Sequence, residues 1–105
     1  MRLIAASLIL LSATACTWVP IESSGKAVRV IPAGAAPAGC VARGEIAVSV
    51  KNKVGFYERN ALRVQEELET LARNEAPSVA ANTVQPLSAP ADGEQRFAAW
   101  QCAQR

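Results

Sequence analysis

The chain has 105 residues, of which 50% are hydrophobic, and its 11 basic and 9 acidic side chains give a formal net charge of +2. The lysines and arginines are spread singly along the sequence, which excludes the basic patch of a nucleic-acid-binding protein. Histidine is absent, so the chain lacks the usual general base and the commonest metal ligand of proteins.

Residues 1–15 have the pattern of an export signal. Arg2 provides a positive start, an apolar run extends from Leu3 to Leu11, and small residues lead to Cys16. The apolar run is well short of the ~20 residues that a membrane-spanning helix needs. Small residues followed by cysteine resemble a bacterial lipobox, which implies that Cys16 is joined to diacylglycerol, becomes the first mature residue and is acylated. The alternative is a soluble periplasmic protein that is cut at the same bond.

On the lipoprotein interpretation, cleavage before Cys16 leaves 90 residues and, because Arg2 is removed, a net charge of +1. Thr17 in place of aspartate after the cysteine implies the outer membrane, by the sorting pattern of such lipoproteins. The domain would then be anchored in that membrane and would face the periplasm. We expect residues 16–25 to be the lipidated cysteine with a short tether, and residues 26–105 to form a single small domain.

Cys40 and Cys102 are the cysteines that remain if Cys16 carries lipid. An oxidising compartment favours a disulfide bond between them, and the chain-entropy model gives a loop of about sixty residues a stabilisation of roughly 4 kcal/mol. A redox-active pair is the alternative. The two cysteines lack the Cys-x-x-Cys spacing that lowers a thiol pKa, so the sequence favours a structural disulfide.

Two strands are expected before the helix. Residues Lys26–Ile31 alternate, with Val28 and Val30 expected on one face and Arg29 on the other, and a loop rich in proline and glycine follows. The second strand begins at Cys40 and places apolar residues at every second position from Ile46 to Val50. Counting by twos puts Cys40 on the face of Ile46, unless a bulge at Gly44 shifts the count.

The sequence predicts one amphipathic helix, from Tyr57 to Glu75, after a turn at residues 51–55. Its apolar residues recur at spacings of three and four, namely Tyr57, Ala61, Val64, Leu68, Leu71 and Ala72. Pro77 disfavours helix at the residue before it and ends the segment. The carboxylates of Glu66, Glu67 and Glu69 could form a metal or acid–base site, but a solvated helix face explains them better.

Two further strands are expected after the helix. A turn at Ser78–Asn82, with Asn82 in a left-handed or capping conformation, leads to a strand at Thr83–Leu87. Pro86 should confine that strand to an edge or an end of the sheet. The last strand, Glu94–Cys102, carries apolar residues on both faces and is predicted to lie inside the sheet, with Ala98, Trp100 and Cys102 on one face and Phe97 and Ala99 on the other.

These elements predict an α+β fold of strand, strand, helix, strand, strand. One helix should cover one face of a small, mainly antiparallel sheet that a single disulfide bond crosslinks. No Gly-x-Ser-x-Gly elbow, phosphate loop or zinc or calcium spacing is present. The lone aspartate, Asp92, lies in a predicted turn. We therefore expect neither enzymatic activity nor a cofactor.

Several segments together resemble an uncharacterised family of small Gram-negative lipoproteins that carry a domain of unknown function. They are the signal with Cys16, the helix sequence ERNALRVQEELETLARNEA, the turn Ala81–Val84, and the closing segments Gly93–Phe97 and Trp100–Cys102. That family is in turn similar to the envelope-stress lipoprotein RcsF, which has a longer, proline-rich tether and a second disulfide. The resemblance implies fold and location, and it transfers no activity.

Two hypotheses about function follow. The first is a non-catalytic outer-membrane lipoprotein that serves as an interaction or structural module and binds an envelope protein through the exposed helix face or an edge such as Thr83–Leu87. The second is a small periplasmic ligand-binding or inhibitor protein, with a pocket around Tyr57, Phe97 and Trp100. A domain of this size has little core to spare for a cavity, so the sequence favours the first hypothesis.

Overall fold

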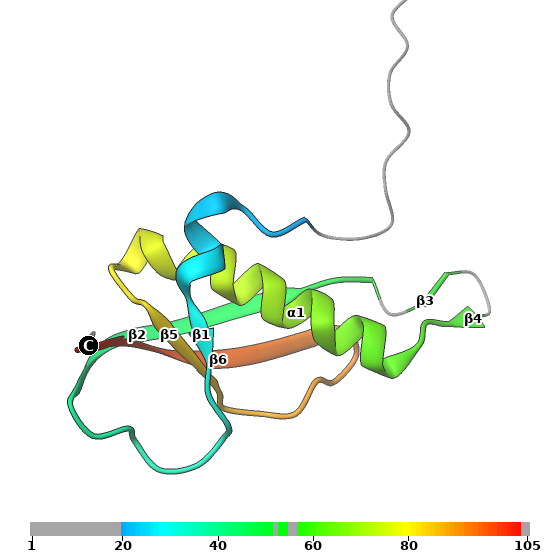
Figure 1. Cartoon of the computed structure of the whole chain (residues 1–105). Coiled ribbons are helices and arrows are strands. Elements are labelled where there is room, and N and C mark those ends of the chain that lie inside the picture. Colours follow the sequence, from blue (N-terminus) through cyan, green and yellow to red (C-terminus); the bar gives the residue numbers. More distant parts are fainter. Residues whose placement is uncertain (1–19, 52, 55–56, 104–105) are drawn as a thin grey trace, which may run out of the picture.

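The computed structural model describes residues 20–51, 53–54 and 57–103, and it confirms the α+β class. One long helix packs on one face of a four-stranded sheet, and a two-stranded hairpin precedes the helix (Figure 1). In chain order the elements are the 3-10 helix η1 (Ser23–Ala27), β1 (Arg29–Val30), β2 (Cys40–Ser49), β3 (Lys53–Val54), β4 (Tyr57–Glu58), α1 (Ala61–Glu75), the 3-10 helix η2 (Ala76–Val79), β5 (Thr83–Pro86) and β6 (Glu94–Cys102).

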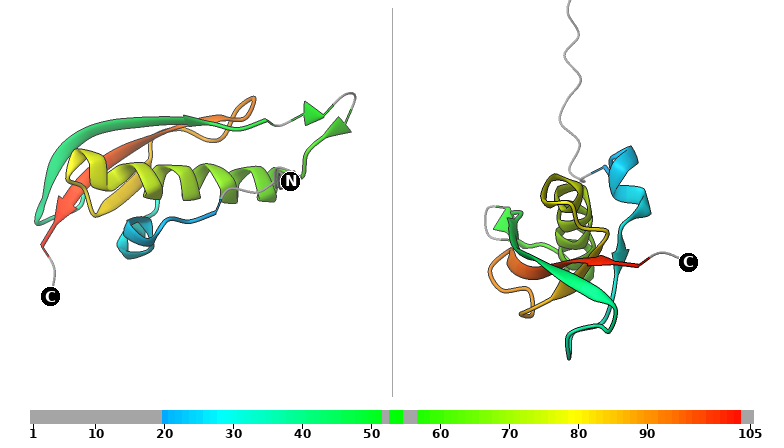
Figure 2. Two further views of the ribbon diagram at one scale, coloured as in Figure 1. Left: turned by 90° about the horizontal axis from the view of Figure 1, so that it is seen from above. Right: turned by 90° about the vertical axis from the view of Figure 1, so that its left-hand side faces the viewer.

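The sheet has the strand order β1-β5-β6-β2. Its long strands, β2 and β6, are antiparallel neighbours, β5 is antiparallel to β6, and only β1 runs parallel to its neighbour β5. The mainly antiparallel sheet is therefore confirmed, and the two further views show α1 lying along one side of it (Figure 2). The short hairpin of β3 and β4 forms a separate two-stranded sheet.

Strand β6 has the bounds and the internal position that the sequence predicts. Phe97 and Ala99 face α1 and are 0% and 1% exposed, within a core that also includes Ile46, Val84 and Ala72. Trp100 and Cys102 lie on the opposite face, as the period of two requires. The central strand thus supplies the largest buried side chain of the core, Phe97.

The predicted side of Cys40 is wrong because a bulge interrupts β2. The pairing of β2 with β6 shifts between Ala42 and Glu45, and Gly44 has a φ of +94°. Ile46 pairs with Phe97 and is buried on the helix side, whereas Cys40 pairs with Cys102 on the other side. One extra residue in a strand reverses the face of every residue before it.

Helix α1 begins four residues later than the sequence predicts. Asn60 is its N-cap, and the Asn60 side chain accepts a hydrogen bond of 3.1 Å from the backbone N–H of Arg63. Such a cap satisfies a backbone donor that the first turn leaves unpaired. Tyr57, which was expected in the helix, belongs to β4 instead. Of the other residues in the predicted stripe, Val64, Leu68 and Ala72 are buried, Leu71 is half-buried and Ala61 is exposed.

The turn after α1 takes its left-handed residue at Ala80, where φ is +59°, and not at Asn82 as expected. The backbone N–H of Ala80 donates to the carbonyl of Pro77 at 3.0 Å, and that of Ala81 donates to Ala76 at 3.0 Å. These two hydrogen bonds end η2 and direct the chain toward the start of β5. Alanine adopts a positive φ at a cost, because its Cβ crowds the backbone there.

Ala80→Gly is therefore expected to stabilise the domain by about 1 kcal/mol, which corresponds to a rise of roughly 4–8 °C in Tm for a domain of this size. Thermal unfolding followed by circular dichroism would measure the shift. Ala47→Gly, at an exposed position of β2, is the control and should lower Tm instead, since glycine weakens a strand. A Tm that falls in both variants would contradict the strain assigned to Ala80.

Strand β5 lies inside the sheet and not at its edge, because β1 pairs with Thr83 and Val84 on its outer side. Pro86 is the last residue of β5, and β1 pairs only with Thr83 and Val84. The missing N–H of Pro86 therefore removes no hydrogen bond between β1 and β5. The predicted strand Lys26–Ile31 is reduced to β1 because the residues before it form η1. Val28 is buried, but Val30, expected on the same face, is 37% exposed.

Candidate functional site

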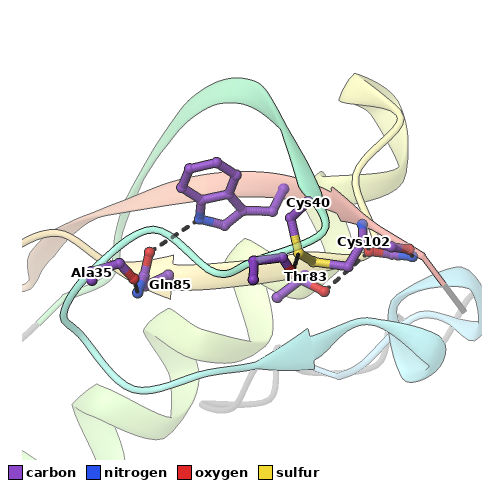
Figure 3. Close-up of a disulfide and its surroundings, with 8 residues drawn as sticks. Ala35, Cys40, Thr83, Gln85 and Cys102 are labelled. Carbon is purple, nitrogen blue, oxygen red and sulfur yellow. Dashed lines mark hydrogen bonds between the residues drawn. A yellow bond between two sulfur atoms is a disulfide. The ribbon is translucent and has the colours of Figure 1, made fainter.

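The face of the sheet opposite α1 is crossed by the loop that joins β1 to β2. We refer to residues 31–39 of this loop as the strap. Gln85 on β5, only 4% exposed, holds the strap in place: its Nε2 donates to the carbonyls of Pro32 at 3.1 Å and Ala35 at 3.0 Å. Figure 3 shows Gln85 directed toward Ala35. Trp100 Nε1 on β6 donates to Gln85 Oε1 at 3.1 Å, so one buried amide joins two strands and the strap.

Gln85 was not predicted to have a role, although a glutamine in the middle of a short strand was a possible signal. A buried amide must find partners for both its oxygen and its nitrogen. Here the partners come from a loop about fifty residues earlier, since Gln85 and Ala35 are 50 positions apart. No local pattern predicts a contact between such distant segments.

The predicted disulfide bond between Cys40 and Cys102 is present. It joins the first residue of β2 to the last residue of β6, and these two residues are direct neighbours across the strands (Figure 3). Cys102 is 8% exposed and Cys40 is partly exposed. The expected lipidation site, Cys16, lies outside the described residues.

Asn82 fixes the same end of β6 by binding the backbone of Cys102 with both atoms of its amide. Asn82 Nδ2 donates to the Cys102 carbonyl at 2.8 Å, and the Cys102 N–H donates to Asn82 Oδ1 at 2.8 Å. The Thr83 hydroxyl donates to the same oxygen at 3.0 Å. The Asn82 side chain thus extends the hydrogen-bond ladder between β5 and β6 by one residue. This role differs from the left-handed or capping conformation that was expected for Asn82.

A pocket of about 270 Å³ lies beside the disulfide, between the strap and the end of the sheet. Its lining is apolar or backbone except for Arg29 and Thr83, and it consists of Arg29, Ile31, Pro37, Ala38, Gly39, Cys40, Thr83, Cys102 and Ala103. The Arg29 side chain is exposed, so the pocket has one cationic group at its wall. It is slightly smaller than the ~300–1,000 Å³ of typical ligand sites.

The pocket expected around Tyr57, Phe97 and Trp100 is not formed as predicted. Phe97 is fully buried under α1, whereas Trp100 lies on the opposite face of β6 and bonds to Gln85. The two rings are separated by the sheet itself. The side chain of Tyr57 lies outside the described residues.

The carboxylates predicted to be solvated on the helix do not behave alike. Glu66 is exposed, but Glu67 is only 5% exposed and forms an ion pair with Arg59, with Nη1–Oε1 at 3.0 Å and Nη2–Oε2 at 2.6 Å. Arg59 also donates to the carbonyl of Lys51 at 2.8 Å. The hydrogen bonds to Glu67 raise the pKa of the Arg59 guanidinium above its ordinary value. This pair attaches the segments that flank the β3–β4 hairpin to α1, and it corrects the expected solvated face at Glu67.

Within residues 20–51, 53–54 and 57–103, no three acidic, cysteine or histidine side chains come together in a group that could hold a metal ion. The same part of the chain contains no helix that is both long and apolar enough to cross a membrane.

A comparison with protein families gives one match, which covers residues 19–102 and is described as a domain of unknown function, DUF4156. The match spans all the strands of the sheet and α1. The chain belongs to this family. No curated protein and no solved structure matches the chain. In this DUF4156 domain the strap, the pocket and the disulfide all lie on one side of the sheet, opposite α1.

Gln85→Ala is expected to destabilise the DUF4156 domain by about 1–3 kcal/mol, because it leaves the Trp100 N–H and the strap carbonyls without their buried partner. Urea denaturation would measure this loss, and amide hydrogen exchange should show faster exchange around the strap. The control is Gln65→Ala on the exposed surface of α1, where the amide lies 3.5 Å from Glu69. An equal, small effect of both changes would contradict the role given to Gln85.

Proposed function

We propose that this DUF4156 chain is a non-catalytic lipoprotein of the bacterial outer membrane. Its lipid would be carried by Cys16, and the folded domain would serve as an interaction or structural module of the cell envelope, facing the periplasm. The observation that carries the proposal is that two of the three cysteines are paired with each other. The Cys40–Cys102 disulfide leaves Cys16, at the end of the signal pattern, as the remaining cysteine.

The disulfide supports an exported protein, because such bonds persist in oxidising compartments. An unpaired cysteine in an exported chain indicates that its thiol is bound to something other than a second cysteine of the chain. Attachment of lipid to Cys16, which follows the small residues at 12–15, would account for this thiol. Several acyl chains would make the anchor stable, whereas a single chain binds a membrane only marginally. From the distant resemblance to RcsF this proposal takes the fold and the location. It does not take a sensing role.

Two surfaces remain for a protein partner. The outer face of α1 carries exposed polar residues such as Arg63 and Glu66. The outer edge of β2 has no strand beside it in the described part of the chain, and Val41 on that strand is 58% exposed. The edge at Thr83–Leu87, considered from the sequence, is unsuitable because β1 covers β5. The bulge at Gly44 divides the edge of β2, which favours short partner segments over long ones.

The pocket beside the disulfide supports a second candidate function, the binding of a small ligand with an anionic group near Arg29. Its volume of about 270 Å³ lies just below the ~300–1,000 Å³ of typical small-molecule sites, which favours the interaction module. A Tm that rises on addition of small carboxylates or phosphates would favour ligand binding. A membrane protein that crosslinks in a fixed ratio through α1 or β2 would favour the interaction module.

Cys16→Ser is expected to move essentially all of the protein from the membrane fraction to the soluble fraction of a Gram-negative host. The intact mass of the unmodified protein should equal residues 16–105 plus acyl chains, and two thiols should become alkylatable only after reduction. Ser23→Ala, an exposed change in η1, should leave both results unaltered. A soluble, unlipidated mass for the unmodified chain would overturn the proposed anchor.

A further inference from the structure

The first described residues of the chain are held against the outer side of α1. Asn74 binds this segment with both atoms of its amide: Nδ2 donates to the Pro20 carbonyl at 3.0 Å, and Oδ1 accepts from the Glu22 N–H at 2.8 Å. Asn74 lies two positions after the fully buried Ala72, which turns it to the far side of the helix. The segment therefore crosses the side of α1 that faces away from the sheet.

Arg73 and Gly25 extend this contact. Arg73 Nε donates to the Val28 carbonyl at 2.9 Å and Nη2 to the Lys26 carbonyl at 3.1 Å. Gly25 is buried in η1, and a Cβ at this position would lie 2.5 Å from Asn74 Oδ1 and 3.2 Å from the Arg73 carbonyl carbon. A larger residue here would have to displace the Asn74 amide from its present position or move η1 away from the helix backbone. Residues 20–28 are thus part of the folded domain.

The held segment and the strap lie on opposite sides of the domain. In Figure 1 the segment from residue 20 through η1, drawn in blue, lies above α1, and the strap lies below the sheet. The side view agrees, with η1 beside the upper part of the helix and the strap at the bottom (Figure 2). Pro20, where the chain leaves toward Cys16, is therefore on the helix side, and the pocket beside the disulfide is on the other.

Only residues 17–19 separate Cys16 from the held Pro20, a connection that reaches roughly 14 Å when fully extended. A domain of about 85 residues is roughly 30 Å across. Without the contacts of Asn74, Arg73 and Gly25, the free connection would continue to Val28 and reach about 40 Å. The held segment thus shortens the connection to less than the width of the domain.

We infer that the domain sits with α1 and η1 against the lipid surface and presents the strap and the disulfide pocket away from it. Of the two surfaces considered for a protein partner, this orientation places the outer face of α1 at the membrane and leaves the outer edge of β2 accessible. This orientation rests on the proposed lipid at Cys16. The exposed side chains on the helix side carry both signs, namely Glu22, Lys26, Arg63 and Glu66. The length of the connection therefore sets the orientation, with no need for attraction to anionic lipids. Asn74 and Gly25 act as a clasp that keeps the pocket turned toward the periplasm.

Energy transfer to the membrane tests this orientation. A dye is attached to Glu66→Cys on the helix side or to Ala35→Cys on the strap, both exposed positions, in the full protein purified from membranes. Each protein is reconstituted in vesicles of phosphatidylethanolamine and phosphatidylglycerol that carry an acceptor dye on the headgroup. Transfer should be clearly stronger from Glu66→Cys than from Ala35→Cys, and Asn74→Ala or Gly25→Val should remove most of that difference.

Matched controls are Thr70→Ala and Ala27→Val. Thr70 is one turn before Asn74, and its hydroxyl donates to the Glu66 carbonyl of its own helix at 2.9 Å; Ala27 is an exposed residue of η1. Both should keep the difference between the two dyes. Circular dichroism checks that the four variants remain folded.

The outcomes separate the orientation from the anchor. Equal transfer from the two dyes, with acyl chains present on Cys16 by mass, would overturn the orientation and leave the proposed lipoprotein intact. A difference that survives both Asn74→Ala and Gly25→Val would overturn the role of the clasp. Absence of acyl chains on Cys16 would overturn the proposed function and the orientation with it.

Discussion

Replacement of both Cys40 and Cys102 by alanine is expected to lower the free energy of unfolding by about 4 kcal/mol, because the bond closes a loop whose ends are 62 positions apart. In the chain-entropy description the crosslink removes open conformations from the unfolded chain. Small domains have a total stability of only about 5–15 kcal/mol. The double variant should therefore lose a large part of its stability and unfold at a much lower temperature than the oxidised protein.

Urea denaturation of the oxidised protein, the reduced protein and the double variant would measure this effect. The reduced protein should behave like the double variant, and both should have a lower midpoint than the oxidised protein with a similar or larger slope. A double variant as stable as the oxidised protein would contradict the structural role. If that folded variant also lost a cellular phenotype, the redox-active alternative for the pair would be favoured.

Phe97→Ala is expected to cost about 3–5 kcal/mol, because it removes a large aromatic side chain from a site that cannot collapse around the space left behind. Phe97 is 0% exposed on the central strand and packs in the cluster that contains Ile46, Ala72 and Val84. These neighbours come from β2, α1 and β5, so the ring joins three elements at once. Its loss should weaken the contact of the helix with the whole sheet.

The matched control is Val41→Ala on β2, since Val41 is 58% exposed and exposed changes of this kind usually stay within about 0.5 kcal/mol. Thermal and urea unfolding of the two variants should differ clearly. Phe97→Leu should recover part of the loss, because it fills more of the volume. A Phe97→Ala variant as stable as Val41→Ala would contradict the placement of the core between α1 and β6.

The sequence patterns predicted the parts of the fold that depend on regular spacing. The stripe of Val64, Leu68 and Ala72 predicted the buried face of α1, and the alternation from Phe97 to Cys102 predicted both faces of β6. These predictions hold because residue spacing alone determines which side chains share a face of a helix or strand. The Cys40–Cys102 disulfide was predicted from the expected oxidising compartment and from the number of cysteines in the chain. Figure 3 shows this disulfide at the end of β6.

The errors occur where a distant contact or a single irregular residue decides the structure. The bulge at Gly44 reverses the face of Cys40, and one left-handed residue at Ala80 displaces the turn expected at Asn82. The buried pair of Glu67 with Arg59 and the contacts of Gln85 with the strap join residues far outside one helical turn or one strand. The candidate pocket depends on the strap, so spacing within single elements could not reveal it.

The central position of β6 also determines when the domain can fold. β6 is the last strand in the described part of the chain and is the partner of both β2 and β5. Most of the sheet therefore cannot assemble until Glu94–Cys102 are available. The pairing of β2 with β6 also joins segments that are far apart in sequence, which slows folding. Under the proposed export of the unfolded chain across the inner membrane, this order would delay formation of the sheet until Glu94–Cys102 have been translocated. Loss of the last nine residues of the sheet, Glu94–Cys102, would leave β2 and β5 without the strand that joins them.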